Sequence, residues 1–142
     1  MLEYSTELHN CCFPFLDNSE TAVLLAVMEN VLIKGGNILY KANDPADCLY
    51  VLVSGKLAVQ KLTGFGDRMQ VVALLESGAP IGESGLLAAR CRGSLVTVVA
   101  DSELLSLSRQ SFSEITAKDP ALAVKVLEWL MGRITWRLHK SS

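Results

Sequence analysis

The chain has 142 residues, of which 50% are hydrophobic and 20% are charged, with a formal net charge of −2. This length suits a single domain (residues 1–142) with its own core, and the weak negative charge argues against a broad nucleic-acid-binding surface. No apolar run approaches the length of a membrane span, and the acidic, polar first residues do not form a secretory signal. We therefore expect a cytoplasmic protein without direct contact to nucleic acid or membrane.

The cysteine and histidine content gives little support for a metal site. The 4 cysteines lack metal-ligand spacing, and the chain has only 2 histidines. Adjacent Cys11 and Cys12 cannot easily form a disulfide with each other, so we expect free thiols. Catalysis also has little support, because neither a G-x-S-x-G nor an H-x-H pattern is present. The sequence therefore favours a protein that is not an enzyme and holds no cofactor.

The first part of the chain is expected to contain one helix. Residues 1–14 show no clear period, which indicates a loose lead-in or a short helix. In the helical region of residues 15–35, either Asp17 or Ser19 is a candidate N-cap. Apolar residues then recur with helical spacing, which predicts an amphipathic helix that runs to about Glu29.

From residue 36 to residue 109 the pattern changes to short β-rich runs separated by Gly, Asn, Asp and Ser. Many short strands at nearly regular spacing are typical of a mainly β fold, here a jelly-roll β-barrel with helices on its flanks. Ser54-Gly55 and Thr63–Asp67 have the composition of hairpin turns. The expected strands are residues 38–40, 48–53, 57–62, 69–75, 95–100 and 104–108.

Residues 110–140 are expected to form two helices. Ser111 and Glu114 have the spacing of a capping box, and Asp119 followed by Pro120 is typical of the start of a longer helix. The broad apolar face of the longer helix predicts packing both on its own domain and on a second copy, as a homodimer. One stripe of that face, at alternating four- and three-residue steps, consists of Leu122, Val126, Trp129, Arg133 and Trp136.

Residues 80–96 carry the chemistry of the chain. Gly82 lets the backbone approach a ligand closely, and a turn or two of helix expected from Ser84 would expose N–H groups that attract an anion. Arg92 adds a planar cation suited to two phosphate oxygens at once. Glu83 would repel an anion, so we interpret its carboxylate as the acceptor for a sugar hydroxyl beside the phosphate. A group with a phosphate and a ribose hydroxyl is a nucleotide.

The pattern G-E-x-x-L-L, followed by R-x-small and a strand, resembles the phosphate-binding cassette of the cyclic nucleotide-binding domain family. A second motif agrees in order and spacing, because residues 36–57 resemble the family's Gly-x-x-Leu/Ile-Phe, Gly-Asp and Asp-x-x-Tyr. Asn43 stands at the usual glycine of that turn, a mild departure because asparagine tolerates a left-handed backbone. The resemblance covers about residues 15–140 and implies a barrel that binds a cyclic nucleotide.

The resemblance implies that the ligand is bound by Gly82, Glu83, Ser84, Arg92, Gly93 and Ser94. Gly93 would lend a backbone N–H to the phosphate, and Ser94 would either add a hydroxyl or face the barrel. In the family the C-terminal helix lies against the base, so the candidate base contacts are Arg133, Trp136 and Arg137, with core packing as the alternative for a tryptophan. Members that favour cGMP often carry a threonine where Gly93 stands here. We therefore expect cAMP to be favoured.

Three interpretations of function stay open. The first is a non-catalytic cyclic nucleotide sensor that signals through its C-terminal helix. The second is a degenerate domain of the same fold that serves as a protein-interaction scaffold and binds no nucleotide. The third is the sensor half of a transcription regulator whose DNA-binding part is missing, because a helix-turn-helix follows this domain in such regulators. The presence of both Glu83 and Arg92 favours the first interpretation.

Overall fold

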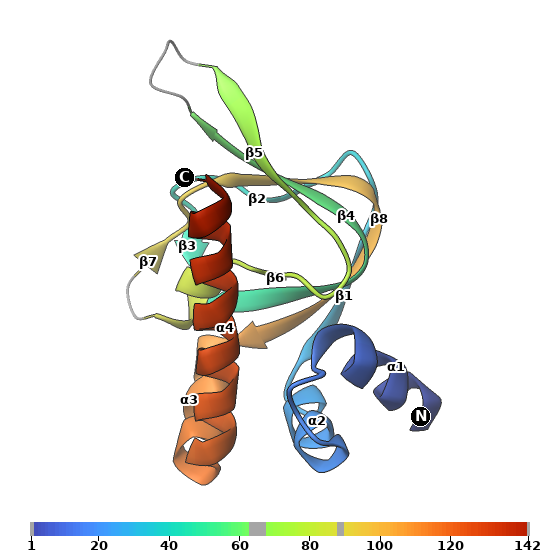
Figure 1. The fold of residues 1–142 in the computed structure, drawn as a ribbon. Helices are drawn as coiled ribbons and strands as arrows, with labels where there is room; N and C mark the ends of the chain where they lie inside the picture. Colours follow the sequence, from blue (N-terminus) through green and yellow to red (C-terminus); the bar gives the residue numbers. More distant parts are fainter. Residues whose placement is uncertain (1, 63–67, 88–89, 142) are drawn as a thin grey trace.

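The computed structural model describes residues 2–62, 68–87 and 90–141. Helices from the two ends of the chain flank an antiparallel sheet (Figure 1). The expected mainly β fold with flanking helices is confirmed. Within these ranges, none of the helices has both the length and the apolar character needed to cross a membrane.

The elements follow one another as two helices, a run of strands and two further helices. The helices are α1 (Leu2–Cys12), α2 (Asn18–Leu25), α3 (Arg109–Lys118) and α4 (Pro120–Ser141), with a turn of 3-10 helix at Glu83–Leu86. The strands are β1 (Glu29–Ile33), β2 (Ile38–Tyr40), β3 (Pro45–Ala46), β4 (Cys48–Leu62), β5 (Met69–Leu75), β6 (Pro80–Ile81), β7 (Arg90–Cys91) and β8 (Leu95–Ser108).

Two long strands form the centre of the sheet. The pairing order is β1-β8-β4-β5, while β2 pairs with β8, β6 pairs with β4, and β3 pairs separately with β7. The expected hairpin turn at Ser54-Gly55 is wrong, because β4 continues through these residues. The register of its pairing with β8 shifts there, as at a β-bulge. Residues 95–100 and 104–108 likewise belong to one strand. The other expected turn, Thr63–Asp67, lies outside the described residues.

The N-terminal region begins with a helix, one of the two structures expected for it. Residues 1–14, interpreted as a loose lead-in or a short helix, contain the helix α1. Asp17 is the N-cap of α2, because its carboxylate accepts a hydrogen bond from the Glu20 N–H at 2.7 Å. However, α2 ends at Leu25 instead of near Glu29, where β1 begins and pairs with β8. Pairing with the sheet therefore overrides the helical spacing of these residues.

The two C-terminal helices begin with side-chain caps. The cap of α3 is Ser108, whose hydroxyl accepts from the Ser111 N–H at 3.0 Å, so the expected cap at Ser111 is wrong by three residues. Asp119 behaves as expected, because its carboxylate accepts from the Leu122 N–H at 3.2 Å and Pro120 opens α4.

Apolar side chains form two clusters, one on each side of β4. The sheet core lies within the curved sheet, between β2, β4, β5, β6 and β8. The basal core lies where α1, α2, α3 and the first half of α4 pack on β4 and β8. Trp129 belongs to the basal core, where its ring stacks on Phe15 at 5.0 Å and meets the edge of Phe13 at 6.1 Å. Its position confirms core packing as the role of this tryptophan.

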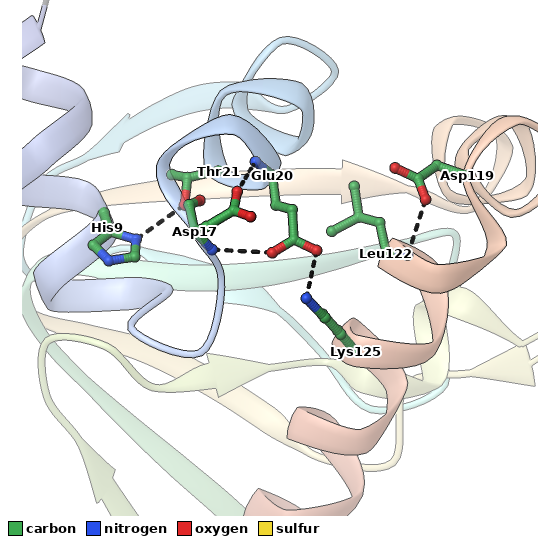
Figure 2. A network of polar contacts seen from close by, with 7 residues as sticks. All are labelled: His9, Asp17, Glu20, Thr21, Asp119, Leu122 and Lys125. Atoms are coloured by element: carbon green, nitrogen blue, oxygen red, sulfur yellow. Dashed lines mark hydrogen bonds and ion pairs between the residues drawn. The ribbon is translucent and has the colours of Figure 1, made fainter.

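Polar contacts on the outside of the basal core join the two ends of the chain. Lys125 of α4 donates to Glu20 of α2 at 2.7 Å (Figure 2). His9 of α1 and Thr21 of α2 share a hydrogen bond at 3.1 Å in the same network. The N-terminal helices and the first turns of α4 therefore form one packed unit beneath the sheet.

Candidate functional site

The guanidinium of Arg92 lies at the centre of the candidate site. It follows β7 and is only 4% exposed. Its Nη1 donates to the Gly82 carbonyl at 2.9 Å, and its Nη2 donates to the Cys48 carbonyl at 2.8 Å. The guanidinium carbon also lies over the ring of Tyr40, 4.4 Å from the ring centroid, and 5.7 Å from the centroid of Tyr50. The side chain is therefore fixed from several sides.

The backbone of Arg92 is held by the turn that follows β2. The Asn43 N–H donates to the Arg92 carbonyl, and the Arg92 N–H donates to the Asp44 carbonyl, both at 2.8 Å. Asn43 adopts a left-handed conformation with φ of 73°, as expected for a residue at the usual glycine of this turn. The two sequence motifs thus meet in space, because one braces the arginine of the other.

A tight turn brings the backbone of the cassette, residues 80–96, against the guanidinium. Gly82 has φ of 76° and ψ of 37°, and a Cβ there would lie 2.3 Å from the Arg92 Nη1. A Cβ on Gly85 would lie 1.9 Å from the Cys48 carbonyl oxygen, so this position also requires glycine. A turn of 3-10 helix begins between these two glycines, at Glu83, so the turn or two of helix expected from Ser84 is present as one turn that starts one residue earlier. Ala88 and Ala89 lie outside the described residues.

Glu83 connects the cassette to the last turns of α4. Its carboxylate lies 3.6 Å from the Arg137 guanidinium, and each side chain is about a third exposed or less, at 31% and 28%. Arg137 also donates to the Pro80 carbonyl. Burial lowers the pKa of Arg137, while the charge of Glu83 acts to raise it. The end of α4 is therefore attached to the cassette by polar contacts.

The structure brings Gly82, Glu83, Arg92 and Arg137 together, whereas the other predicted residues lie around them. Ser94 is half-buried, and Gly93 is exposed beside open space. Ser84 accepts a backbone hydrogen bond from Leu87 at 3.0 Å. Arg133 is half-buried one helical turn before Arg137, and Trp136 is 59% exposed. The roles assigned to these residues stay predictions.

In the part of the chain that the structure describes, the polar partners of the Arg92 guanidinium are all neutral groups. Its polar contacts there are two carbonyl oxygens and, at 3.6 Å, the Cys48 thiol. A buried cation is costly unless an anion accompanies it. The five N–H donors of a guanidinium also exceed the two that the carbonyls use. This arrangement suits a small anion such as a phosphate.

Sequence reasoning missed the lining of this site. Tyr40, Cys48 and Tyr50 surround the Arg92 guanidinium, and burial is the first cause that raises the pKa of each. These side chains therefore stay protonated and neutral near pH 7. A signal was present, because all three residues fall in the strand-turn-strand motif of residues 36–57.

The comparisons with known proteins agree with this geometry. The model of the cyclic nucleotide-binding domain family matches residues 31–119, which include both motifs. The chain belongs to the cyclic nucleotide-binding domain family.

Individual relatives come from eukaryotes and bacteria. The cAMP-dependent protein kinase regulatory subunit of Dictyostelium discoideum is 31% identical over 102 residues, which are 70% of this chain but 31% of that protein. A cyclic nucleotide-binding domain from Methylobacillus flagellatus KT superposes with a TM-score of 0.87 at 25% identity, covering 98% of this chain and 80% of that one. The regulatory domain of Toxoplasma gondii PKA, solved with cAMP, gives 0.66 at 28% identity and covers 78% of this chain and 42% of that one.

Proposed function

We propose that this chain is a non-catalytic sensor domain that binds a cyclic nucleotide, with cAMP favoured over cGMP. The observation that carries the proposal is the buried Arg92 guanidinium, 4% exposed and held by neutral groups against the glycine turn of the cassette. A cyclic phosphate carries one negative charge, which would neutralise this cation without bringing a second charge close to Glu83. Relatives solved with cAMP or named for it support the choice of base.

Each candidate residue has a role in this proposal. Arg92 and the Gly93 N–H bind the phosphate, with Gly82, Ser84 and Ser94 shaping its surroundings. Glu83 accepts a hydrogen bond from the ribose 2′-hydroxyl, as an ionised acceptor makes the stronger bond. On α4, the candidates for contact with the base are Arg133, Trp136 and Arg137.

Binding would be reported through α4. Arg92 is 4% exposed, so a ligand reaches it only when part of its cover moves. The end of α4 is placed for such movement, because Arg137 contacts both Glu83 and the Pro80 carbonyl. A ribose hydroxyl that binds Glu83 would compete with Arg137. The ligand would then favour a different position of the helix end by its differential affinity.

We also propose a cytoplasmic homodimer that forms through α4. Exposed apolar residues follow this helix at steps of three, four and seven residues, as on a coiled-coil face, and they are Val124, Leu127, Met131 and Leu138. They lie on a different face from the buried Leu122 and Val126, so one helix can pack on its own domain and on a second copy. Sedimentation should show a dimer that Leu127→Glu or Met131→Glu dissociates. A wild-type monomer at high concentration would contradict this part of the proposal.

Calorimetry of the purified chain with cAMP, cGMP and a cyclic dinucleotide tests the function. We expect saturable heat with cAMP and weaker binding of cGMP. No heat and no thermal shift with any of the three would favour the scaffold without a nucleotide. Tighter binding of cGMP would leave the sensor in place and overturn the base preference.

A further inference from the structure

The ring of Tyr40 lies beneath the Arg92 guanidinium. It ends β2 and is 9% exposed, and its ring belongs to the sheet core. The guanidinium carbon lies 4.4 Å from the ring centroid, a distance at which the face of an aromatic ring attracts a cation. The Tyr50 ring stacks behind it, with centroids 6.4 Å apart and planes at 23°. The Tyr40 ring therefore restricts where the guanidinium plane can lie.

The hydroxyl of Tyr40 is not required by this packing, because a phenylalanine would make the same ring contacts. The hydroxyl is carried on a ring whose centroid lies 4.4 Å from the guanidinium carbon, so it lies close to any anion that binds Arg92. The charges of Arg92, Glu83 and Arg137 all act on the pKa of this phenol. Burial is the largest cause that raises its pKa, so the phenol keeps its proton at neutral pH and can donate.

We propose that Tyr40 is a ligand-binding residue of the anion site, with its ring positioning Arg92 and its hydroxyl donating to the same phosphate. The inference rests on the proposed function and names a contact on this site beyond the cassette itself. A neutral donor beside a guanidinium suits a singly charged phosphodiester, because it adds a hydrogen bond without adding charge. Tyr40 would therefore help to set both the affinity for the phosphate and its orientation.

Removal of single hydroxyl groups tests the assignment. In calorimetry with cAMP, Tyr40→Phe should bind about tenfold more weakly, the effect of losing one hydrogen bond to a charged group. Thr116→Val is the control, because it also removes one hydroxyl, but an exposed one on α3, where it donates to the Phe112 carbonyl at 2.9 Å. We expect the control to bind as the wild type does. Unchanged affinity in Tyr40→Phe, or an equal loss in both variants, would overturn the proposal.

A second readout separates contact with the phosphate from a general structural effect. The two phosphorothioate diastereomers of cAMP each carry sulfur at a different exocyclic oxygen. Tyr40→Phe should change the ratio of their affinities. If the substitution weakens both diastereomers equally, its effect is a looser fold, and the proposed contact with the phosphate is overturned. Wild type that binds no cAMP would overturn the proposed function together with this assignment. If the wild type binds cAMP but Tyr40→Phe leaves the diastereomer ratio unchanged, only the role of Tyr40 is overturned, and the proposed function stands.

Discussion

The two halves of α4 lie in different environments. In the first half, Leu122 and Val126 are 0% and 1% exposed in the basal core, and Trp129 stacks on Phe15. In the second half, Trp136 and Leu138 are 59% and 67% exposed, and Arg137 reaches the cassette through an ion pair and a carbonyl. Apolar burial fixes the first half whatever the site contains. The polar contacts of the second half depend on what Glu83 binds, so this half can respond to a ligand.

The largest effect is expected where the site holds its buried charge. Arg92→Ala should lose roughly 2–5 kcal/mol of cAMP binding, because the phosphate is left without its cation. Lysine should not fully restore binding, since it cannot present a planar fork. Calorimetry measures both variants, with Arg90→Ala as the control, an exposed arginine on β7 two residues earlier. Equal affinities in Arg92→Ala and Arg90→Ala would contradict the assignment.

The next effect is on stability and concerns the fixed half of α4. Trp129→Ala should lower the free energy of unfolding by about 3 kcal/mol, because it leaves a cavity between α4 and the N-terminal segment. Trp136→Ala should cost much less, as that side chain is 59% exposed. Urea denaturation compares the two. Similar losses from both variants would show that the two halves of α4 do not differ as described.

The basal core should also weaken in alkali. Burial, followed by the neighbouring Cys11, raises the pKa of the Cys12 thiol from 9.0 to about 12. Below pH 9 the thiol is neutral in both the folded and the unfolded chain, so its contribution to the free energy of unfolding is fully present. Between pH 9 and about 12 the unfolded chain ionises first, so stability falls as pH rises, by up to about 2 kcal/mol at pH 10.5.

Denaturation at pH 8 and pH 10.5 measures this effect. Cys12→Ala should lose less stability over the interval than the wild type does, even though its stability at pH 8 is lower. Cys91→Ala is the control, because Cys91 is exposed. An identical loss of stability in Cys12→Ala and the wild type would show that Cys12 does not contribute.

A smaller effect is expected at the contact between the cassette and the sugar. Glu83→Gln should weaken cAMP binding by about 1 kcal/mol, because a neutral amide accepts a weaker hydrogen bond than a carboxylate does. The 2′-deoxy analogue serves as the internal control in the same titration. The substitution should weaken binding of that ligand less. Equal losses for both ligands would show that Glu83 does not bind the ribose 2′-hydroxyl.

The smallest effect concerns the base. A Cβ at Gly93 meets no atom within 4 Å, so a side chain there fits without displacing its neighbours. Gly93→Thr should raise the affinity for cGMP about threefold, the worth of a weak neutral hydrogen bond to guanine. Competition titration against cAMP measures it, with Gly93→Ala as the control for a side chain without a hydroxyl. A gain of the same size in Gly93→Ala would assign the effect to the backbone instead.

Local rules predicted the parts of this structure that local contacts decide. The Asp17 cap, the Asp119-Pro120 helix start and the left-handed Asn43 all depend on residues within a few positions of each other. The helix expected to reach about Glu29 ends at Leu25 because β1 pairs with a strand far along the chain. The continuous course of β4 and β8 also depends on pairing between distant residues, which composition does not report.

The candidate site also combines features that neighbouring residues decide with contacts between distant residues. The cassette residues are consecutive in sequence, and the resemblance identified them together with the family. The contacts of Arg92 with Tyr40 and Cys48 join separate strands, so their spacing carries no direct signal. The sequence places Trp129 on the apolar face of the long helix, but helical periodicity gives only the width of such a face and not the element that covers it, here Phe15.

A crystal structure of the chain with cAMP would show directly whether the nucleotide binds at Arg92 and Glu83. We expect the phosphate at the Arg92 guanidinium, with two N···O distances of about 3 Å. We also expect the ribose 2′-hydroxyl on Glu83 in place of Arg137. A nucleotide bound elsewhere, or a phosphate that Arg92 does not touch while it keeps only the Gly82 and Cys48 carbonyls, would contradict the account.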